Sequence, residues 1–291
     1  MRPLPTPVFL TYDQAALDYQ YDNQAKVPNW AEVRKQLTAG SEAARAAFTC
    51  RLDERYGAHP RQVLDVFIPE GPGPHPVHLF IHGGYWQRND KSGSSYVARS
   101  LVPAGYLTVV TNYGLIPDVS MGTLVEHCRA ALAWVFQHAA ALGGDPAQIT
   151  LSGHSAGGHL VALLMATDWA ARGLPADVIK AGCSISGIYD LEPVRLSSQN
   201  AGMQLSPAEA ARNSPALLPA PHGARLLLAV GALEGPEFHR QAEALEAAWN
   251  RQHQICTVLD VAGQDHFSMA AQVGAPASAL SQALLAHIRP T

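Results

Sequence analysis

A serine between two glycines is the most chemically specific feature of the chain. The sequence G-H-S-A-G spans residues 153–157, directly after an apolar run and directly before a helical pattern. A chance G-x-S-x-G is the ordinary alternative in a glycine-rich chain, but the strand–turn–helix setting is the one that a nucleophile elbow requires. The turn is so tight that a side chain at Gly153 or Gly157 would collide with a neighbouring element. We therefore predict that Ser155 is a nucleophile exposed above a sheet, beside the N-terminal N–H groups of a helix.

A second glycine-rich stretch could stabilise the charge that such a nucleophile creates. The sequence H-G-G-Y-W, residues 82–86, follows an earlier apolar strand. Loops at this place in nucleophile-elbow enzymes supply half of an oxyanion hole. Glycine has no Cβ to block the pocket, so we expect the N–H groups of Gly83 and Gly84 to join that of Ala156 in binding a tetrahedral oxyanion.

The other residues of this stretch have alternative roles. His82 is expected to orient the loop, and a role in proton transfer is the less favoured alternative. Trp86 either anchors the loop or, if it is exposed to the cleft, forms an aromatic wall for a flat substrate. Tyr85, next to it, is a further candidate for substrate contact.

A serine hydroxyl needs a base, and the base needs a third group to fix its tautomer. In nucleophile-elbow enzymes the chain order is serine, acid, histidine. His266 follows the last expected strand, in "DVAGQDHFSM", and is the predicted base. Glu234, just past the preceding strand, is the predicted acid. Glu237 is a rival placed where a helix begins, and Asp265 is too close to the histidine along the chain for good geometry.

The elements that must position these residues alternate between strand and helix. This alternation predicts an α/β fold with a mostly parallel central sheet and helices on both faces. Strands are expected at 62–68, 77–82, 107–112, 148–153, 179–186, 225–231 and 254–261, and helices at 30–48, 122–142, 156–172, 237–251 and 277–288.

Two regions depart from this alternation. Residues 1–60 form an N-terminal extension expected to pack on or near the active site, and residues 190–222, rich in Pro, Ser and Asn, are expected to form a small lid or pocket wall. The rest suggests no second core, so residues 1–291 are interpreted as a single domain.

Composition excludes several classes of function. The net charge is −4, with no run of Lys or Arg, so neither nucleic acid nor a membrane surface is an expected partner. Four scattered cysteines, the absence of a signal-peptide pattern and the absence of a membrane-length apolar span favour a cytoplasmic protein. His75, His78 and His82 lie close together in sequence, but their spacing does not suit one ion, so no metal is expected.

The motifs together resemble one family. The stretches "HGGYWQ", "GHSAGGHL", "GIYDLEPVRLSSQNAGMQLSPAEAARNSP", "EGPEFHRQ" and "DHFSM" are similar to kynurenine formamidase, or arylformamidase, of the α/β-hydrolase type. The early "YDNQAKVPNW" is similar to its N-terminal segment. The resemblance covers roughly residues 18–290, and its most specific part is 187–215. It implies an α/β-hydrolase fold and hydrolysis of N-formyl-L-kynurenine to kynurenine and formate, without a cofactor.

The resemblance also carries over site residues. It implies Ser155 as nucleophile and His266 as base, and it marks Tyr189 and Asn200 as candidate pocket residues. The family usually has Asp as its triad acid, whereas this chain has Glu234 at the matching place.

Two arginines and two other functions stay open at this stage. Arg88 and Arg195 are conceivable partners for a substrate carboxylate. A carboxylesterase acting on small-acyl or aryl esters is the alternative function, and a non-catalytic binding protein on a hydrolase scaffold is a minor one. The oligomeric state does not follow from the sequence.

Overall fold

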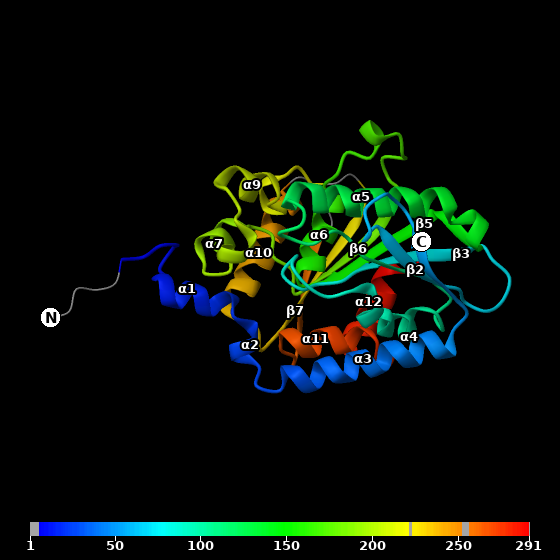
Figure 1. Ribbon diagram of the computed structural model, residues 1–291, viewed down its shortest axis with the longest axis horizontal. Coiled ribbons are helices and arrows are strands. Elements are labelled where there is room, and N and C mark those ends of the chain that lie inside the picture. The colour runs from blue at the N-terminus through cyan, green and yellow to red at the C-terminus, as the bar shows by residue number, and fades with distance from the viewer. Residues whose placement is uncertain (1–5, 221–222, 252–255, 291) are drawn as a thin grey trace.

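An eight-stranded sheet organises the molecule (Figure 1). The computed structural model describes residues 6–220, 223–251 and 256–290. The strand order is β1-β2-β4-β3-β5-β6-β7-β8; β2 pairs antiparallel with β1 and with β4, and the remaining pairs are parallel. The strands are β1 (Cys50–Arg55), β2 (Val63–Phe67), β3 (His75–Ile81), β4 (Leu107–Thr111), β5 (Gly144–His154), β6 (Ile179–Ile185), β7 (Arg225–Gly231) and β8 (Cys256–Val261).

Helices cover both faces of the sheet, as Figure 1 shows. Helices α5, α6 and α10 lie on one face, and α3, α4, α11 and α12 lie on the other. The α-helices are α1 (Gln14–Tyr21), α2 (Asn23–Lys26), α3 (Trp30–Ala47), α4 (Ala98–Leu101), α5 (Met121–His138), α6 (Ala156–Met165), α7 (Glu192–Leu196), α8 (Asn200–Met203), α9 (Pro207–Arg212), α10 (Pro236–Asn250), α11 (His266–Val273) and α12 (Ala279–Ile288).

The buried sheet follows from its strand sequences. In β3, Val77, Leu79 and Ile81 belong to the core on one face, while Phe80 belongs to the core on the other. A parallel strand covered by helices on both sides needs apolar residues in both directions, which is why such strands read as continuous apolar runs rather than as alternating ones.

The mostly parallel sheet and the two helical layers agree with the sequence prediction. The strand expected at 254–261 is β8, which begins at Cys256; its first two residues lie outside the described part of the chain. Strand β1 was not predicted, because "CRLDER" is largely polar and exposed at the sheet edge, where charged side chains are common. Among the helices of eight or more residues, α1 and α11 were also not predicted, and none of the shorter helices was.

The two regions that interrupt the alternation are mainly helical. The N-terminal extension holds α1, α2 and α3, beyond residues 1–5, which lie outside the description. The insertion contains α7, α8 and α9 and is described as far as residue 220, so 221–222 are outside as well. No helix in the described ranges is long and apolar enough to cross a membrane.

Candidate active site

Ser155 lies in a strained turn between β5 and α6. Its φ is 57° and its ψ is −120°, values that are costly for a residue with a side chain. The flanking glycines make the turn possible: a Cβ on Gly153 would lie 2.4 Å from the Gly157 carbonyl oxygen, and a Cβ on Gly157 would lie 2.0 Å from the Ile81 carbonyl oxygen. The collisions expected from the sequence are therefore present at both glycines.

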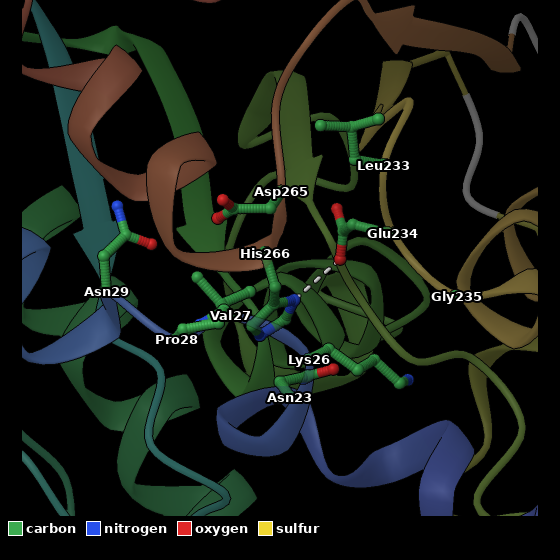
Figure 2. Close-up of a pocket in the computed structure, with 10 residues that line it drawn as sticks. All are labelled: Asn23, Lys26, Val27, Pro28, Asn29, Leu233, Glu234, Gly235, Asp265 and His266. Carbon is green, nitrogen blue, oxygen red and sulfur yellow. Dashed lines mark hydrogen bonds and ion pairs between the residues drawn. The ribbon is translucent and has the colours of Figure 1, made fainter.

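The structure brings together Ser155 from the turn between β5 and α6, Glu234 from the loop after β7, and His266 from the start of α11. The Ser155 Oγ is 3.0 Å from His266 Nε2, and His266 Nδ1 is 2.7 Å from Glu234 Oε2. Figure 2 shows the second of these contacts as a dashed line. An ionised carboxylate can only accept hydrogen bonds, so the proton of the neutral imidazole is on Nδ1. The lone pair of Nε2 then faces the serine hydroxyl, as proton abstraction requires.

Three donors hold the carboxylate of Glu234. Besides His266, Ser186 donates its hydroxyl to Glu234 Oε1 at 2.5 Å, and the Gly231 N–H donates to the same oxygen at 2.8 Å. The side chain is only 1% exposed. Burial alone would raise the pKa of Glu234, but the charge on His266 and these hydrogen bonds outweigh it, so the pKa is lowered. The carboxylate therefore stays ionised beside the histidine.

The two rival carboxylates have other partners. Glu237 is fully buried and accepts two hydrogen bonds from Arg240 at 2.8 Å, and one from the Tyr21 hydroxyl at 3.1 Å. Asp265 caps α11, because its Oδ1 accepts hydrogen bonds from the N–H groups of the next turn. Neither contacts the imidazole of His266 in the described structure.

Gly83, Gly84 and Ala156, the expected oxyanion donors, lie near Ser155: the two glycines line the same cavity as Ser155, and Ala156 is the next residue in the chain. Gly83 comes so close to the elbow that a Cβ on it would lie 3.0 Å from the Ser155 Cβ. In the described chain, none of the three N–H groups has a hydrogen-bond acceptor. Ala156 is the first residue of α6, whose N-terminus favours negative charge. The arrangement can bind an oxyanion.

Two side chains fix the orientation of the Gly83–Gly84 peptide. The Gly83 carbonyl oxygen accepts hydrogen bonds from His82 Nδ1 at 2.8 Å and from Asn89 Nδ2 at 3.1 Å. In a trans peptide the next N–H points the opposite way from the carbonyl. Holding this carbonyl therefore directs the Gly84 N–H. His82 stacks on Tyr113, and burial lowers its pKa to about 4, so it is neutral. This geometry matches the orienting role expected for His82.

Trp86 is not an aromatic wall of the cleft. Its side chain is completely buried, and its Nε1 donates to His159 Nδ1 at 3.1 Å. His159 in turn donates from Nε2 to the Asn213 carbonyl at 2.7 Å. The alternative that the sequence left open, an anchor for the loop, is the one that the structure has. The backbone of Trp86 is in the left-handed region, with a φ of 57°.

Three other candidate substrate contacts lie away from the cavity. Tyr189 is fully buried and its hydroxyl is 2.7 Å from Ser184 Oγ. Asn200 bonds both backbone groups of Leu205, so it closes a local turn. Arg195 forms a two-pronged ion pair with Glu192 at 2.7 Å. The sequence suggests Tyr189 and Asn200 as pocket residues and Arg195 as a partner for a substrate carboxylate. In the structure, each of the three instead bonds a nearby residue of the protein.

The main cavity, of about 540 Å³, opens in front of Ser155. Such a volume suits a small-molecule ligand. Its walls come from residues 82–90, named the oxyanion loop after their expected role, from the N-terminal extension and from the start of α11. The residues on the cavity include Tyr21, Asp22, Trp30, Arg34, Glu42, Gly83, Gly84, Tyr85, Arg88, Ser155, Gln199 and His266. Tyr85 lines it as expected, and its hydroxyl donates to the Tyr21 carbonyl.

A smaller cavity of about 160 Å³ is lined in part by the histidine–glutamate pair itself (Figure 2). It is lined by Asn23, Lys26, Glu234 and His266, among others. The Lys26 ammonium donates to the Gln20 carbonyl at 2.6 Å, and burial lowers the pKa of Lys26. The N-terminal extension thus encloses His266 from this side.

Sequence reasoning missed several residues of this site. Ser186 and Asn89 are a hydroxyl and an amide in ordinary-looking loops, and only the fold places them on Glu234 and Gly83. Asp22, which lines the cavity, comes from a segment without a chemical motif. No cluster of possible metal ligands occurs among the described residues.

Comparison of the sequence with known proteins assigns the chain to a family. The kynurenine formamidase of Danio rerio is 32% identical over 243 residues, which covers 81% of this chain and 81% of the relative. The chain belongs to the kynurenine formamidase family. The resemblance expected from the motifs is therefore confirmed. The BD-FAE family model also matches residues 64–198.

Solved structures establish the fold. A candidate thioesterase from Silicibacter sp. TM1040 superimposes with a TM-score of 0.80 at 30% identity, covering 94% of this chain and 98% of that one. An esterase from Pyrobaculum calidifontis has a TM-score of 0.69 at 20% identity, covering 91% of this chain and 95% of that one. The predicted α/β-hydrolase fold is confirmed, and the family is one of hydrolases.

Proposed function

We propose that the protein is a serine hydrolase that cleaves the formyl amide of N-formyl-L-kynurenine and releases L-kynurenine and formate. The observation that carries the proposal is the hydrogen-bonded series Ser155, His266 and Glu234 at the cavity of about 540 Å³. Membership of the kynurenine formamidase family supports the choice of substrate.

In the proposed first step, Ser155 becomes a formyl ester. His266 accepts the serine proton on Nε2, which is 3.0 Å away, as Oγ bonds to the formyl carbon. The carbonyl oxygen becomes an oxyanion facing the N–H groups of Gly83, Gly84 and Ala156. The positive end of the α6 helix dipole further stabilises this negative charge. The imidazolium then gives its proton to the aryl nitrogen, and the C–N bond breaks.

In the second step, water cleaves the ester by the same route. His266 accepts a proton from water as its oxygen bonds to the formyl carbon, and the collapse of the second tetrahedral intermediate returns the proton to Ser155 Oγ and releases formate. Glu234 keeps its negative charge throughout and stabilises the imidazolium in both steps, which its three donors and lowered pKa favour. These residues complete the reaction without a cofactor.

The cellular setting is part of the same proposal. The four cysteines are free thiols, which suits a reducing compartment such as the cytoplasm. The proposed partner is a small aromatic formamide, and neither nucleic acid nor a membrane is required.

A carboxylesterase is the second candidate. Of the two solved structures compared above, the one with the higher TM-score is a candidate thioesterase. Ester hydrolysis and formamide hydrolysis can also use the same nucleophile, base and oxyanion hole. The two functions differ in the leaving group, since an anilide nitrogen must be protonated as it departs.

The test compares substrates in one enzyme preparation. We would measure kcat/KM for N-formyl-L-kynurenine, p-nitrophenyl acetate and p-nitrophenyl butyrate, with Ser155→Ala as the blank. We expect the formamide to be preferred by orders of magnitude, and the blank to lose about 10⁶ in turnover if the three residues act as a unit. Rapid ester cleavage with negligible formamide turnover would support the esterase instead, and near-normal activity of the blank would refute the mechanism.

A further inference from the structure

We propose that Arg88 and Asp22 form a subsite for the charged end of a zwitterionic α-amino acid, with Arg88 binding the carboxylate and Asp22 binding the ammonium group. The inference rests on the proposed function and deepens it, because it names the residues that would select an amino-acid formamide over a neutral ester.

Both side chains line the cavity that contains Ser155. Arg88 belongs to the oxyanion loop, five residues after Gly83, and its N–H donates to the Gly84 carbonyl at 3.1 Å. Asp22 joins α1 to α2. Part of the cavity is therefore bounded by one residue from the catalytic loop and one from the N-terminal extension.

Tyr85 brings these two segments together. Its hydroxyl donates to the carbonyl of Tyr21, the residue directly before Asp22, while its backbone belongs to the loop that carries Arg88. Both charges act on this hydroxyl: the negative charge of Asp22 adds to burial in raising the pKa of Tyr85, and the positive charge of Arg88 opposes it. The carboxylate of Asp22 and the guanidinium of Arg88 therefore line the same cavity as Tyr85, close enough for their charges to act on its hydroxyl.

Neither charge is neutralised by the protein. Within the described ranges, the Arg88 guanidinium has no hydrogen bond and no ion pair. Asp22 uses one oxygen, Oδ1, to accept the Ala25 N–H at 3.1 Å, and its other oxygen accepts nothing in that part of the chain. Both residues are exposed to the cavity solvent.

The two charges are not paired with each other either. No nitrogen of Arg88 lies within 4.0 Å of an oxygen of Asp22. Arginines elsewhere do form such pairs, as Arg195 does with Glu192 and Arg240 does with Glu237. Two opposite charges that line one cavity and do not pair with each other can bind a ligand that carries both charges.

An α-amino acid meets that description. A guanidinium offers a planar pair of N–H donors that matches a carboxylate, and a carboxylate is the complementary acceptor for an ammonium group. A neutral ester would gain nothing from either residue. The subsite therefore favours an amino-acid formamide over a neutral ester by binding the end of the substrate far from the reacting carbonyl. The catalytic residues act in the same way on the reacting end of both substrates.

Arg34 provides a matched control. It also lines the cavity and has no ion pair in the described structure, but it projects from α3 rather than from the oxyanion loop. Its removal changes the charge of the cavity by the same amount as removal of Arg88. The comparison separates a specific contact from a general electrostatic effect.

The experiment uses two formamides with the same reacting group. One is N-formyl-L-kynurenine, and the other is N-(2-acetylphenyl)formamide, which lacks the amino-acid end. We would measure kcat/KM for both with the wild-type chain, Arg88→Met, Asp22→Asn and Arg34→Met. Asparagine can still cap α2, so the Asp22 variant is expected to fold; thermal unfolding of every variant checks this.

The selectivity ratio, kcat/KM for the amino-acid substrate over that for the truncated one, is the deciding quantity. We expect it to fall about 10- to 100-fold in Arg88→Met, about 3- to 10-fold in Asp22→Asn and less than about 3-fold in Arg34→Met. An equal fall in the Arg34 and Arg88 variants would overturn the specific contact. A wild-type ratio near one would overturn the subsite but leave formamide hydrolysis standing, whereas no cleavage of either formamide would overturn the proposed function and the subsite with it.

Discussion

The substitution Glu234→Gln tests the catalytic geometry because the donors around this side chain dictate how an amide must sit. Ser186 and the Gly231 N–H both donate to Oε1, at 2.5 and 2.8 Å. An amide has one oxygen and one NH₂ group, and only the oxygen can accept both bonds. The NH₂ group is therefore forced to the Oε2 position, 2.7 Å from His266 Nδ1.

This placement gives His266 the wrong tautomer. An NH₂ group donates to Nδ1, so the imidazole proton moves to Nε2, which then cannot accept the proton of Ser155. The corresponding Asp→Asn change in a serine protease lowers kcat about 10⁴-fold, and we expect a loss of about 10³- to 10⁴-fold here. Turning the amide over would restore the tautomer but would set the NH₂ group against the Gly231 N–H and leave that donor without an acceptor, at about 1–3 kcal/mol.

The assay is kcat/KM for N-formyl-L-kynurenine, with thermal unfolding to verify the fold. Glu237→Gln is the matched control, since Glu237 is also buried but bonds Arg240 and Tyr21 instead of His266. We expect the control to lose stability and less than about tenfold in kcat. A loss below tenfold in Glu234→Gln, or an equal loss in both variants, would refute the reasoning.

Two further predictions concern the oxyanion loop and stability. In Asn89→Gly, glycine tolerates the φ of 78° at this position, but one of the two donors to the Gly83 carbonyl is lost. We therefore expect steady-state kinetics to show kcat about 2- to 10-fold lower, with a smaller change in KM. A change in KM alone would contradict this prediction. Burial lowers the pKa of His78, His82 and His159 to about 3, 4 and 4, below about 6.5 in the unfolded chain. The unfolded state therefore binds more protons between these values, and the free energy of unfolding should fall as the pH drops from 7 to 5, by up to about 1.4 kcal/mol per pH unit for each histidine. Urea denaturation at several pH values checks this, and pH-independent stability would be incompatible with it.

Motifs that depend on residues adjacent in the chain could be identified from the sequence. The glycines around Ser155 and the Gly83–Gly84 pair are needed because backbone atoms approach them closely, and such a requirement leaves a local pattern. The long apolar strands and amphipathic helices were found for a similar reason, since burial on both faces of a parallel sheet imposes a composition on each strand. Chain order alone then placed Glu234 and His266 after the appropriate strands.

Contacts between distant segments left no such pattern. Asn89 and Ser186 look like ordinary loop residues until the fold places them on the Gly83 carbonyl and on Glu234. Trp86 resembled a substrate contact because a large aromatic beside glycines suggests exposure, yet His159, 73 residues away, receives its indole N–H in the core.

The sequence by itself therefore determined the chemistry that this chain can support, because a nucleophile elbow, a glycine loop and a late histidine are defined by local backbone demands. Only the tertiary structure decided what surrounds that chemistry. The N-terminal extension reaches the cavity through hydrogen bonds such as that from Tyr85 to Tyr21, and it brings Asp22 to the same cavity as Arg88. Those placements depend on packing between segments far apart in the chain, which no local pattern of residue types records.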